Sequence, residues 1–226
     1  MNYTYLGHSA FLLETETHLL LFDHTKDTPK LPSDTKPLLV FSSHRHSDHY
    51  NPVIFSLAER EGPTVFVLSS DIASTDIPFS CTINPMGPYE EDIVEGLVVK
   101  TLKSTDEGVA FVVEAEGKTI YFAGDLNHWH WEGESEQYNA QMAEAYHKEL
   151  TLLPRHLDLA FVPVDPRLGP FYSLGAKELV NHVSVDTLIP MHTWEDYTVC
   201  SRLEHEIGNL VGKVIQLETI PQTWRI

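Results

Sequence analysis

The chain has 226 residues, of which 42% are hydrophobic and 21% charged, so residues 1–226 can bury the core of one ordinary domain and general disorder is excluded. A formal net charge of −18 disfavours nucleic-acid binding, which needs clustered Lys and Arg, but permits an anionic small substrate beside bound divalent cations. The sequence shows no bilayer-length apolar run, no secretory signal and only two distant cysteines, which predicts a cytoplasmic protein without a membrane partner.

Short apolar runs typical of β-strands dominate the first half of the chain. The predicted strands, in chain order, are residues 3–6, 11–14, 19–22, 38–41, 64–68, 97–102, 109–114 and 119–123. A Pro-rich and Asp/Thr-rich loop is expected at 25–37, and Pro52 suits the first turn of a helix that ends near Arg60. Segment 71–96, interrupted by prolines, gives no clear prediction.

Helices and strands alternate in the second half. Helices are predicted at 137–152 and 174–182, and strands at 159–162 and 187–190. We find no internal repeat and no linker. The pattern therefore suits one domain with two packed β-sheets and helices outside them.

Four candidate metal ligands, His44, His46, Asp48 and His49, lie within six residues directly after the predicted strand 38–41. Alternation places His44 and His46 on the same side, whereas Asp48 and His49 can turn toward a neighbouring point. Imidazole and carboxylate donors together suit zinc, and also manganese or iron. The sequence thus predicts one or two divalent cations, with zinc preferred, and the arrangement favours two in one cleft.

The run His44-Arg45-His46-Ser47-Asp48-His49 resembles the H-x-H-x-D-H signature of the metallo-β-lactamase superfamily. Other pieces follow in that family's order between about residues 3 and 192: Asp23 at the end of an early strand, Gly124-Asp125, and His192 after a late strand. The resemblance implies an αββα sandwich of two mixed sheets flanked by helices, with the active site at one edge. Gly7-His8-Ser9 further resembles the branch that contains the ascorbate-6-phosphate lactonase.

The resemblance also implies ligand roles. It assigns His44 and His46 to a first metal, Asp48, His49 and His192 to a second metal, Asp125 to a bridge between the two, and Asp23 to orienting a ligand imidazole. The sequence independently favours Asp125, because this residue follows the strand 119–123 through a glycine. His8 is a candidate outer contact of a ligand or a contact of the substrate.

One departure from the family pattern concerns the first metal. The family usually supplies a third histidine between the central motif and the bridging Asp, but residues 103–108 contain none. Thr105 lies nearest the expected place, with Asp106 adjacent. Three interpretations stay open: Asp106 substitutes as an oxygen ligand and hardens the site toward manganese or iron, the first site is weak or empty, or His128 or His130 reaches in.

Three further residues are candidates for contacting the substrate. Asn127 and Trp129 follow Asp125 closely and could line a pocket, although tryptophans are more often packing residues. Arg167 follows an apolar strand and could meet an anion at the cleft, although a surface ion pair is the commoner role of an arginine.

The leading functional hypothesis is hydrolysis of a small ester, lactone or phosphodiester by a metal-held hydroxide, with Asp48 orienting the water and handling its proton. The alternative is a metal-binding regulatory module with little or no catalysis, since an incomplete first site need not activate water. A di-iron oxidoreductase is a weaker third possibility. The sequence does not identify the substrate, the metal or the oligomeric state.

Overall fold

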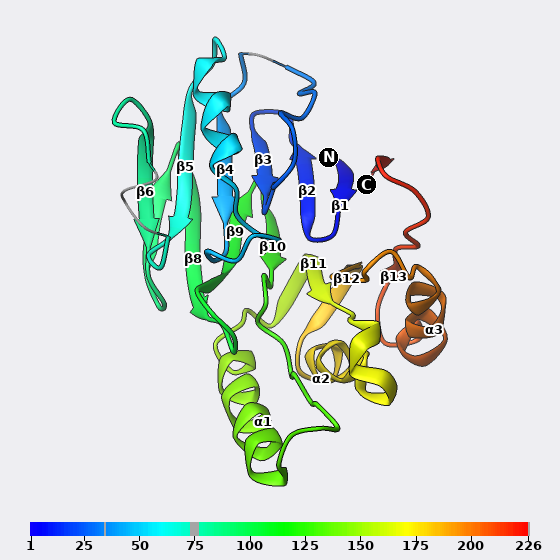
Figure 1. Cartoon of the computed structure of the whole chain (residues 1–226). Helices are drawn as coiled ribbons and strands as arrows, with labels where there is room; N and C mark the ends of the chain where they lie inside the picture. Colours follow the sequence, from blue (N-terminus) through cyan, green and yellow to red (C-terminus); the bar gives the residue numbers. More distant parts are fainter. Residues whose placement is uncertain (34, 73–76, 226) are drawn as a thin grey trace.

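The protein is described from a computed structural model, which places residues 1–33, 35–72 and 77–225. Two mixed β-sheets pack face to face (Figure 1). The first sheet has the strand order β14 (Gln222–Arg225), β1 (Asn2–Gly7), β2 (Ala10–Glu14), β3 (Leu19–Phe22), β4 (Leu38–Ser42), β5 (Thr64–Ser69) and β6 (Thr82–Met86). The second has the order β13 (Lys213–Val214), β12 (Ser184–Met191), β11 (His156–Pro163), β10 (Lys118–Phe122), β9 (Val109–Ala115), β8 (Leu97–Lys103) and β7 (Glu91–Val94).

Each sheet is parallel in one part and antiparallel in the other. Strands β3 to β6 are mutually parallel, as are β10 to β13, whereas β1 to β3 and β7 to β10 pair antiparallel. Every residue of β3 and β4 is buried, as expected for parallel strands that are covered on both faces. This burial explains the continuous apolar runs that predicted these strands from the sequence.

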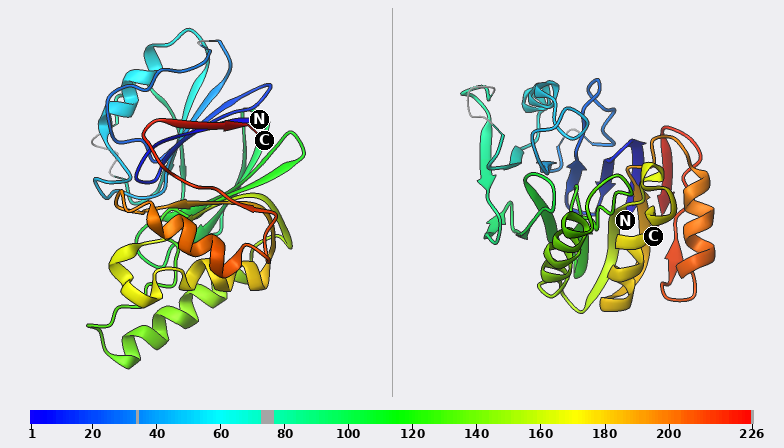
Figure 2. Two further views of the ribbon diagram at one scale, coloured as in Figure 1. Left: turned by 90° about the vertical axis from the view of Figure 1, so that its right-hand side faces the viewer. Right: turned by 60° about the horizontal axis from the view of Figure 1, so that its bottom comes forward.

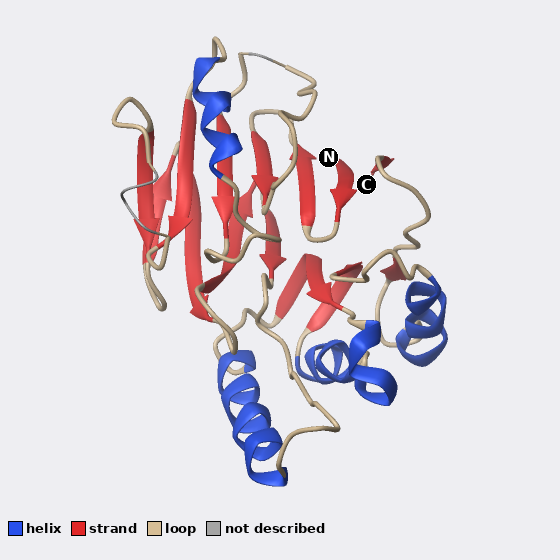
Figure 3. Ribbon diagram, in the orientation of Figure 1, coloured by secondary structure: helices blue, strands red, loops and turns tan. Residues whose placement is uncertain are grey.

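Helices cover the outer faces of both sheets (Figure 3). The 3₁₀ helix Pro52–Glu59 contacts β5 of the first sheet, and its first turn is capped by Asn51 Oδ1, which accepts a hydrogen bond from Val53 N at 3.0 Å. On the second sheet, α2 (Leu174–His182) contacts β11 and β12, and α3 (Thr198–Ile207) contacts β13. Helix α1 (Glu136–Leu150) packs beside α2. The predicted αββα sandwich is therefore confirmed.

The main core lies between the sheets and contains, among many aliphatic side chains, a group of phenylalanines in mutual contact. Phe22 of the first sheet stacks on Phe122 of the second with ring centroids 4.6 Å apart, and Phe11 meets Phe161 at 4.7 Å. A smaller apolar cluster lies under the 3₁₀ helix, on the outer face of the first sheet. Stacked aromatic side chains contribute more than their buried area alone, so this interface fixes how the sheets face each other.

The elements that the sequence left unassigned are mostly short or at sheet edges. Strand β6, at one edge, contains Pro85, which an edge strand tolerates because it needs fewer ladder hydrogen bonds. The C-terminal strand β14 pairs antiparallel with β1, which places the two chain ends side by side (Figure 2). Within the described residues, no helix combines the length and the apolar character needed to cross a bilayer.

Candidate metal centre

Strand ends and tight turns bring the candidate ligands to one edge of the sandwich. The motif 44–49 follows β4, Asp125 follows β10, and His192 follows β12. His8 lies in the turn between β1 and β2 with φ of 49°, and its carbonyl oxygen accepts a hydrogen bond from His192 N at 3.3 Å. That bond joins the two sheets at the site and turns His8 toward the other imidazoles.

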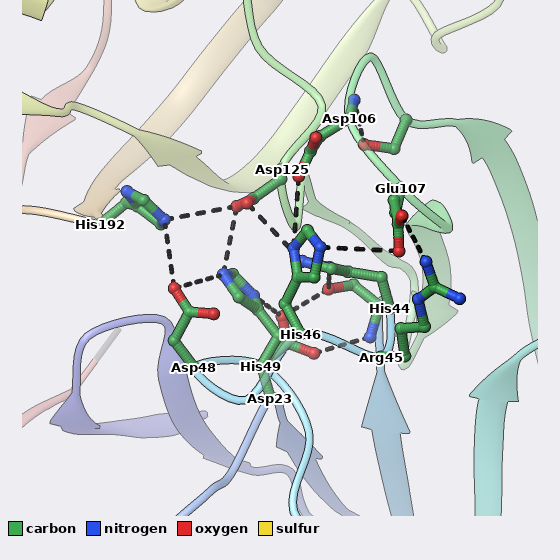
Figure 4. A network of polar contacts seen from close by, with 12 residues as sticks. Asp23, His44, Arg45, His46, Asp48, His49, Asp106, Glu107, Asp125 and His192 are labelled. Carbon is green, nitrogen blue, oxygen red and sulfur yellow. Dashed lines mark hydrogen bonds and ion pairs between the residues drawn. The ribbon is translucent and has the colours of Figure 1, made fainter. Parts of the chain in front are cut away.

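The donor atoms form two groups (Figure 4). The first group comprises His44, His46, Asp106 and Asp125, and the second comprises His8, Asp48, His49 and His192. In each group, one donor atom per residue lies within 4.8 Å of the donor atoms of the others. The structure thus brings together residues that are up to 184 positions apart in the chain (8 to 192).

Asp125 lies between the two groups. Its Oδ2 is 3.7 Å from His44 Nε2, and its Oδ1 is 3.2 Å from His49 Nε2 and 3.6 Å from His192 Nε2. Each oxygen of this carboxylate therefore faces a different group, as the predicted bridging role requires. Burial, followed by the nearby carboxylates of Asp106 and Asp48, raises the pKa of Asp125 well above its ordinary value. Bound cations would relieve this crowding of negative charge.

The distances between the donor atoms of the second group suit a divalent cation. Asp48 Oδ2 lies 3.3 Å from His8 Nε2 and 3.9 Å from the Nε2 atoms of both His49 and His192. Donor atoms that each lie about 2.0–2.2 Å from one zinc ion are separated by roughly such distances. The Nε2 atoms of His44, His49 and His192 and Oδ1 of Asp125 are buried without a hydrogen-bond partner in the described part of the chain. Because unpaired buried polar atoms are costly, these four atoms fit cation ligands.

The imidazoles are in the protonation state that metal binding needs. Burial lowers the pKa of His44 to about 4, of His49 to about 3 and of His192 to about 4. All three are therefore neutral near pH 7. The Nδ1 atom of His49 lies 2.7 Å from Asp23 Oδ2, so the proton sits on Nδ1 and the lone pair of Nε2 is free to coordinate.

Two buried carboxylates orient the imidazoles of the second group. Asp23 contacts His49 and is fixed in turn by Ser43, whose backbone N–H and hydroxyl both donate to it at 2.7 Å. This position matches the orienting role expected for Asp23. Asp165 Oδ2 accepts the corresponding hydrogen bond from His192 Nδ1 at 2.9 Å.

The surroundings of His46 show which of the candidate residues lie near the first group. Asp106 Oδ2 is 3.4 Å from His46 Nδ1, so the carboxylate next to the expected place of the third histidine is within reach of the group. His128 does not reach in, because its Nδ1 lies 2.8 Å from Glu178 Oε2 on α2. The ring of His130 packs on Phe171 at 3.9 Å, outside both donor groups. The interpretation with a substituting histidine is therefore wrong.

Two glycines let the loops around the centre approach each other. A Cβ atom on Gly108 would lie 2.1 Å from Ser43 O, and one on Gly124 would lie 2.6 Å from Ser43 Cβ. Both glycines also have positive φ, 69° and 52°. Asp106 lies two residues before Gly108, and Asp125 directly follows Gly124. The two close contacts with Ser43 therefore hold both carboxylates near the turn that follows β4.

A cavity of about 250 Å³ opens over the centre. It is lined by His46, Asp48, Thr105, Asp106, Asp125, Trp129, Trp131, Tyr138, Met142, Arg167 and His192. Trp129 therefore lines the cavity, while its indole N–H donates to Asp125 O at 2.9 Å. Arg167 also lies there, with its guanidinium 4.3 Å from the ring centre of Trp194. The cavity thus combines acidic ligands on one side with aromatic and cationic side chains on the other.

Two predicted residues have different roles. Asn127 is buried, and its side-chain oxygen points at Gly175, where an added Cβ would approach it to 1.9 Å. The expectation that Asn127 lines the cavity is therefore wrong, because helix α2 covers its side chain. Thr105 reaches the cavity, but its hydroxyl donates to Asn127 O at 2.6 Å and accepts from Asn127 N at 3.0 Å. It ties the loop of Asp106 to the loop of Asp125.

Two residues of the site were missed in the sequence. Asp165 is fully buried and accepts hydrogen bonds from His192, Arg167 and the indole N–H of Trp194 at 3.2 Å. Burial acts to raise the pKa of Asp165, but the hydrogen bonds from His192 and Arg167 prevail and hold it below the ordinary value. The signal for Asp165 was its place directly after a buried strand, as for Asp23. Trp194 carried no comparable signal.

Comparisons with known proteins agree with this architecture. A family model described as the beta-lactamase superfamily domain matches residues 2–192. A UPF0173 metal-dependent hydrolase of Opitutus terrae is 30% identical over 214 residues, covering 85% of this chain and 84% of that protein. Igni18, a metallo hydrolase of Ignicoccus hospitalis, has a TM-score of 0.66 at 16% identity over 100% of both chains. CmlA, a diiron beta-hydroxylase of Streptomyces venezuelae, has a TM-score of 0.63 at 13% identity, covering 100% of this chain and 54% of that one.

The two structural likenesses, at such low identity, show the fold alone. The family model and the relative from Opitutus terrae go further, because they match most of the chain in sequence. The chain belongs to the metallo-β-lactamase superfamily and, within it, to the UPF0173 metal-dependent hydrolase family.

Proposed function

We propose that this protein hydrolyses a small ester, lactone or phosphodiester with the help of two divalent cations. The single observation that carries this proposal is the position of Asp125, whose two oxygens face two separate groups of buried, unpartnered donors at the floor of a cavity. Zinc is preferred for the nitrogen-rich group, and manganese or iron are alternatives where oxygen donors prevail. Divalent cations there would lower the pKa of a water molecule and polarise the bond to be cleaved.

Asp48 is the residue that we propose to orient the attacking water. Its carboxylate lines the cavity, and the imidazole of His8 beside it lowers the pKa of Asp48 well below its ordinary value. The group is therefore ionised at neutral pH and can accept a hydrogen bond from water. Its side chain is 38% exposed, which leaves room for a substrate.

The far side of the cavity favours a small anionic substrate with an apolar part. Arg167, whose guanidinium is also paired with Asp165, supplies positive charge, and Trp129 with Trp131 supplies flat apolar surface. The turn Gly7-His8-Ser9 supports a substrate of the kind used by the lactonase branch, a phosphorylated lactone. Two free thiols, Cys81 and Cys200, support a reducing, cytoplasmic setting.

The regulatory-module alternative was motivated by the absence of a third histidine at the first site. Asp106 supplies a donor at that place, so the first site has the ligands to hold a cation. For this reason we favour the enzyme over the module.

The proposal is tested with the variants Asp48→Ala and His192→Ala. We expect both to lose bound metal and to lose turnover of lactone and phosphodiester panels. Asp92→Ala on β7, which contacts Asn84 rather than the centre, is the control and keeps both properties. Unchanged metal content in Asp48→Ala and His192→Ala would overturn the proposal. A wild-type protein with full metal content that turns over no ester would favour the regulatory module.

A further inference from the structure

The two donor groups differ in how far water can enter them. In the second group, His49 and His192 have side chains that are 0% and 2% exposed, and those of His8 and Asp48 are 19% and 38% exposed. In the first group, His46 and Asp106 are 42% and 43% exposed, and only His44 and the shared Asp125 are buried. Water that competes for a cation therefore reaches the first group more easily.

The groups also differ in the chemistry of their donors. The turn between β1 and β2 adds His8 to His49 and His192, so the second group has three imidazoles and one carboxylate. The first group has two imidazoles and two carboxylates, those of Asp106 and of the shared Asp125. Nitrogen-rich sets favour zinc, and oxygen-rich sets favour harder cations such as Mn²⁺.

The outer contacts differ in the same direction. In the second group, His49 and His192 each face a buried carboxylate through Nδ1, at 2.7 Å and 2.9 Å. In the first group, the corresponding atom of His44 faces only the hydroxyl of Ser43, at 3.0 Å. Outer carboxylates fix the ring and raise the basicity of the ligand, and their loss typically costs 10- to 100-fold in metal affinity.

We propose that the two sites of this chain differ in affinity and in metal preference. The group of His8, Asp48, His49 and His192 is the tight site, which fills first and prefers Zn²⁺. The group of His44, His46 and Asp106 is the weak site, whose cation exchanges with the surroundings and which accepts Mn²⁺ more readily. Metal supply would then set how much of the protein is dinuclear. The inference rests on the proposed dinuclear function and concerns only the order and identity of the cations.

The test begins with the metal-free full-length protein, titrated with Zn²⁺ against a competing chromophoric chelator. We expect two steps whose dissociation constants differ by about tenfold or more. Crystals with one equivalent of Zn²⁺, measured at the zinc edge, should show anomalous scattering at His49 and His192 and none at His46. Added Mn²⁺ should then appear beside His46 and Asp106. A single ion beside His44 and His46 at one equivalent would overturn the inference.

Variants separate the two steps. His46→Ala should abolish the weak step and leave the tight step within about twofold, whereas His192→Ala should abolish the tight step. Asp106→His restores the third imidazole of the first site, so it should tighten the weak step by about tenfold for Zn²⁺ and weaken it for Mn²⁺. This gain cannot come from a damaged fold. If His46→Ala abolishes the tight step, or Asp106→His leaves both steps unchanged, the inference is wrong.

The outcomes also separate this inference from the function on which it rests. Two equal steps, or a tight step at His44 and His46, would contradict the proposed order and leave the hydrolase intact. Failure of the wild-type protein to bind Zn²⁺, Mn²⁺ or Fe²⁺ would overturn both.

Discussion

Replacing Asp165 with Asn tests whether the buried carboxylate behind His192 controls metal affinity. Oδ2 of Asp165 accepts hydrogen bonds from His192 Nδ1 at 2.9 Å, from Arg167 Nε at 2.9 Å and from Trp194 Nε1 at 3.2 Å. Asparagine has nearly the same shape but only one acceptor oxygen, and its NH₂ group cannot accept. Either orientation of the amide leaves donors facing a donor. With the NH₂ group toward His192, the ring loses the partner that fixes its tautomer, and with the oxygen toward His192, the ring keeps only a neutral, weaker acceptor.

The expected loss can be estimated in two ways. Removing an outer partner of a ligand histidine typically weakens metal binding 10- to 100-fold, which is about 1.4–2.8 kcal/mol. A hydrogen bond to a charged acceptor contributes about 1.5–3 kcal/mol. The two agree, so we expect the dissociation constant of the first Zn²⁺ equivalent to rise by one to two orders of magnitude.

The assay is a Zn²⁺ titration against a chromophoric chelator, at a temperature where circular dichroism shows both proteins to be folded. Asp92→Asn is the matched control, because Asp92, on β7, also accepts hydrogen bonds through its carboxylate, from Asn84 Nδ2 at 2.6 Å and from Ile93 N at 2.7 Å, but lies outside the centre. The control should bind zinc as the wild type does. A dissociation constant for Asp165→Asn within twofold of the wild-type value would refute the reasoning.

Two further variants test the loop packing and the cavity wall. Gly124→Ala should lower the free energy of unfolding by about 2–4 kcal/mol in urea titrations, because its Cβ would meet Ser43 at 2.6 Å in a backbone with φ of 52°. The control Gly117→Ala, at φ of 73° in open space, should lower it by only about 1–2 kcal/mol. Equal losses would contradict the steric account. Arg167→Ala should raise KM about tenfold for anionic esters and less than twofold for neutral ones, because it removes the cation from the cavity wall. The control Arg202→Ala, which removes an arginine stacked on Tyr172 outside the cavity, should change neither KM value. A uniform rise in KM for both substrate types would contradict the anion-binding role.

Local sequence determined much of the centre. Buried parallel strands appear as continuous apolar runs, and His44, Asp125 and His192 each follow such a run, so the sequence identified them as candidates at strand ends. Only the resemblance implied that they are neighbours, because β4 belongs to one sheet and β10 and β12 belong to the other. The resemblance to the superfamily supplied the order of the motifs and the αββα architecture. Both depend on short stretches of chain whose chemistry is visible without coordinates.

The partners of those ligands were decided by tertiary structure. Nothing local distinguishes Asp106 from His128 as the donor beside His46, because the choice depends on Glu178, which holds His128 from helix α2. The role of His8 depends on a turn with positive φ and on a hydrogen bond that crosses between the sheets.

The roles of Asp165 and Asn127 were also decided by tertiary contacts that the sequence does not show. Asp165 reaches His192 because β11 and β12 pair in parallel register, and Asn127 turns away from the cavity because α2 lies close beside it. Sequence thus determined which residues carry metal-binding chemistry. Sheet register and helix packing, which depend on contacts between residues far apart in the chain, decided which of them meet, because an imidazole or carboxylate reaches only a few ångströms from its own backbone.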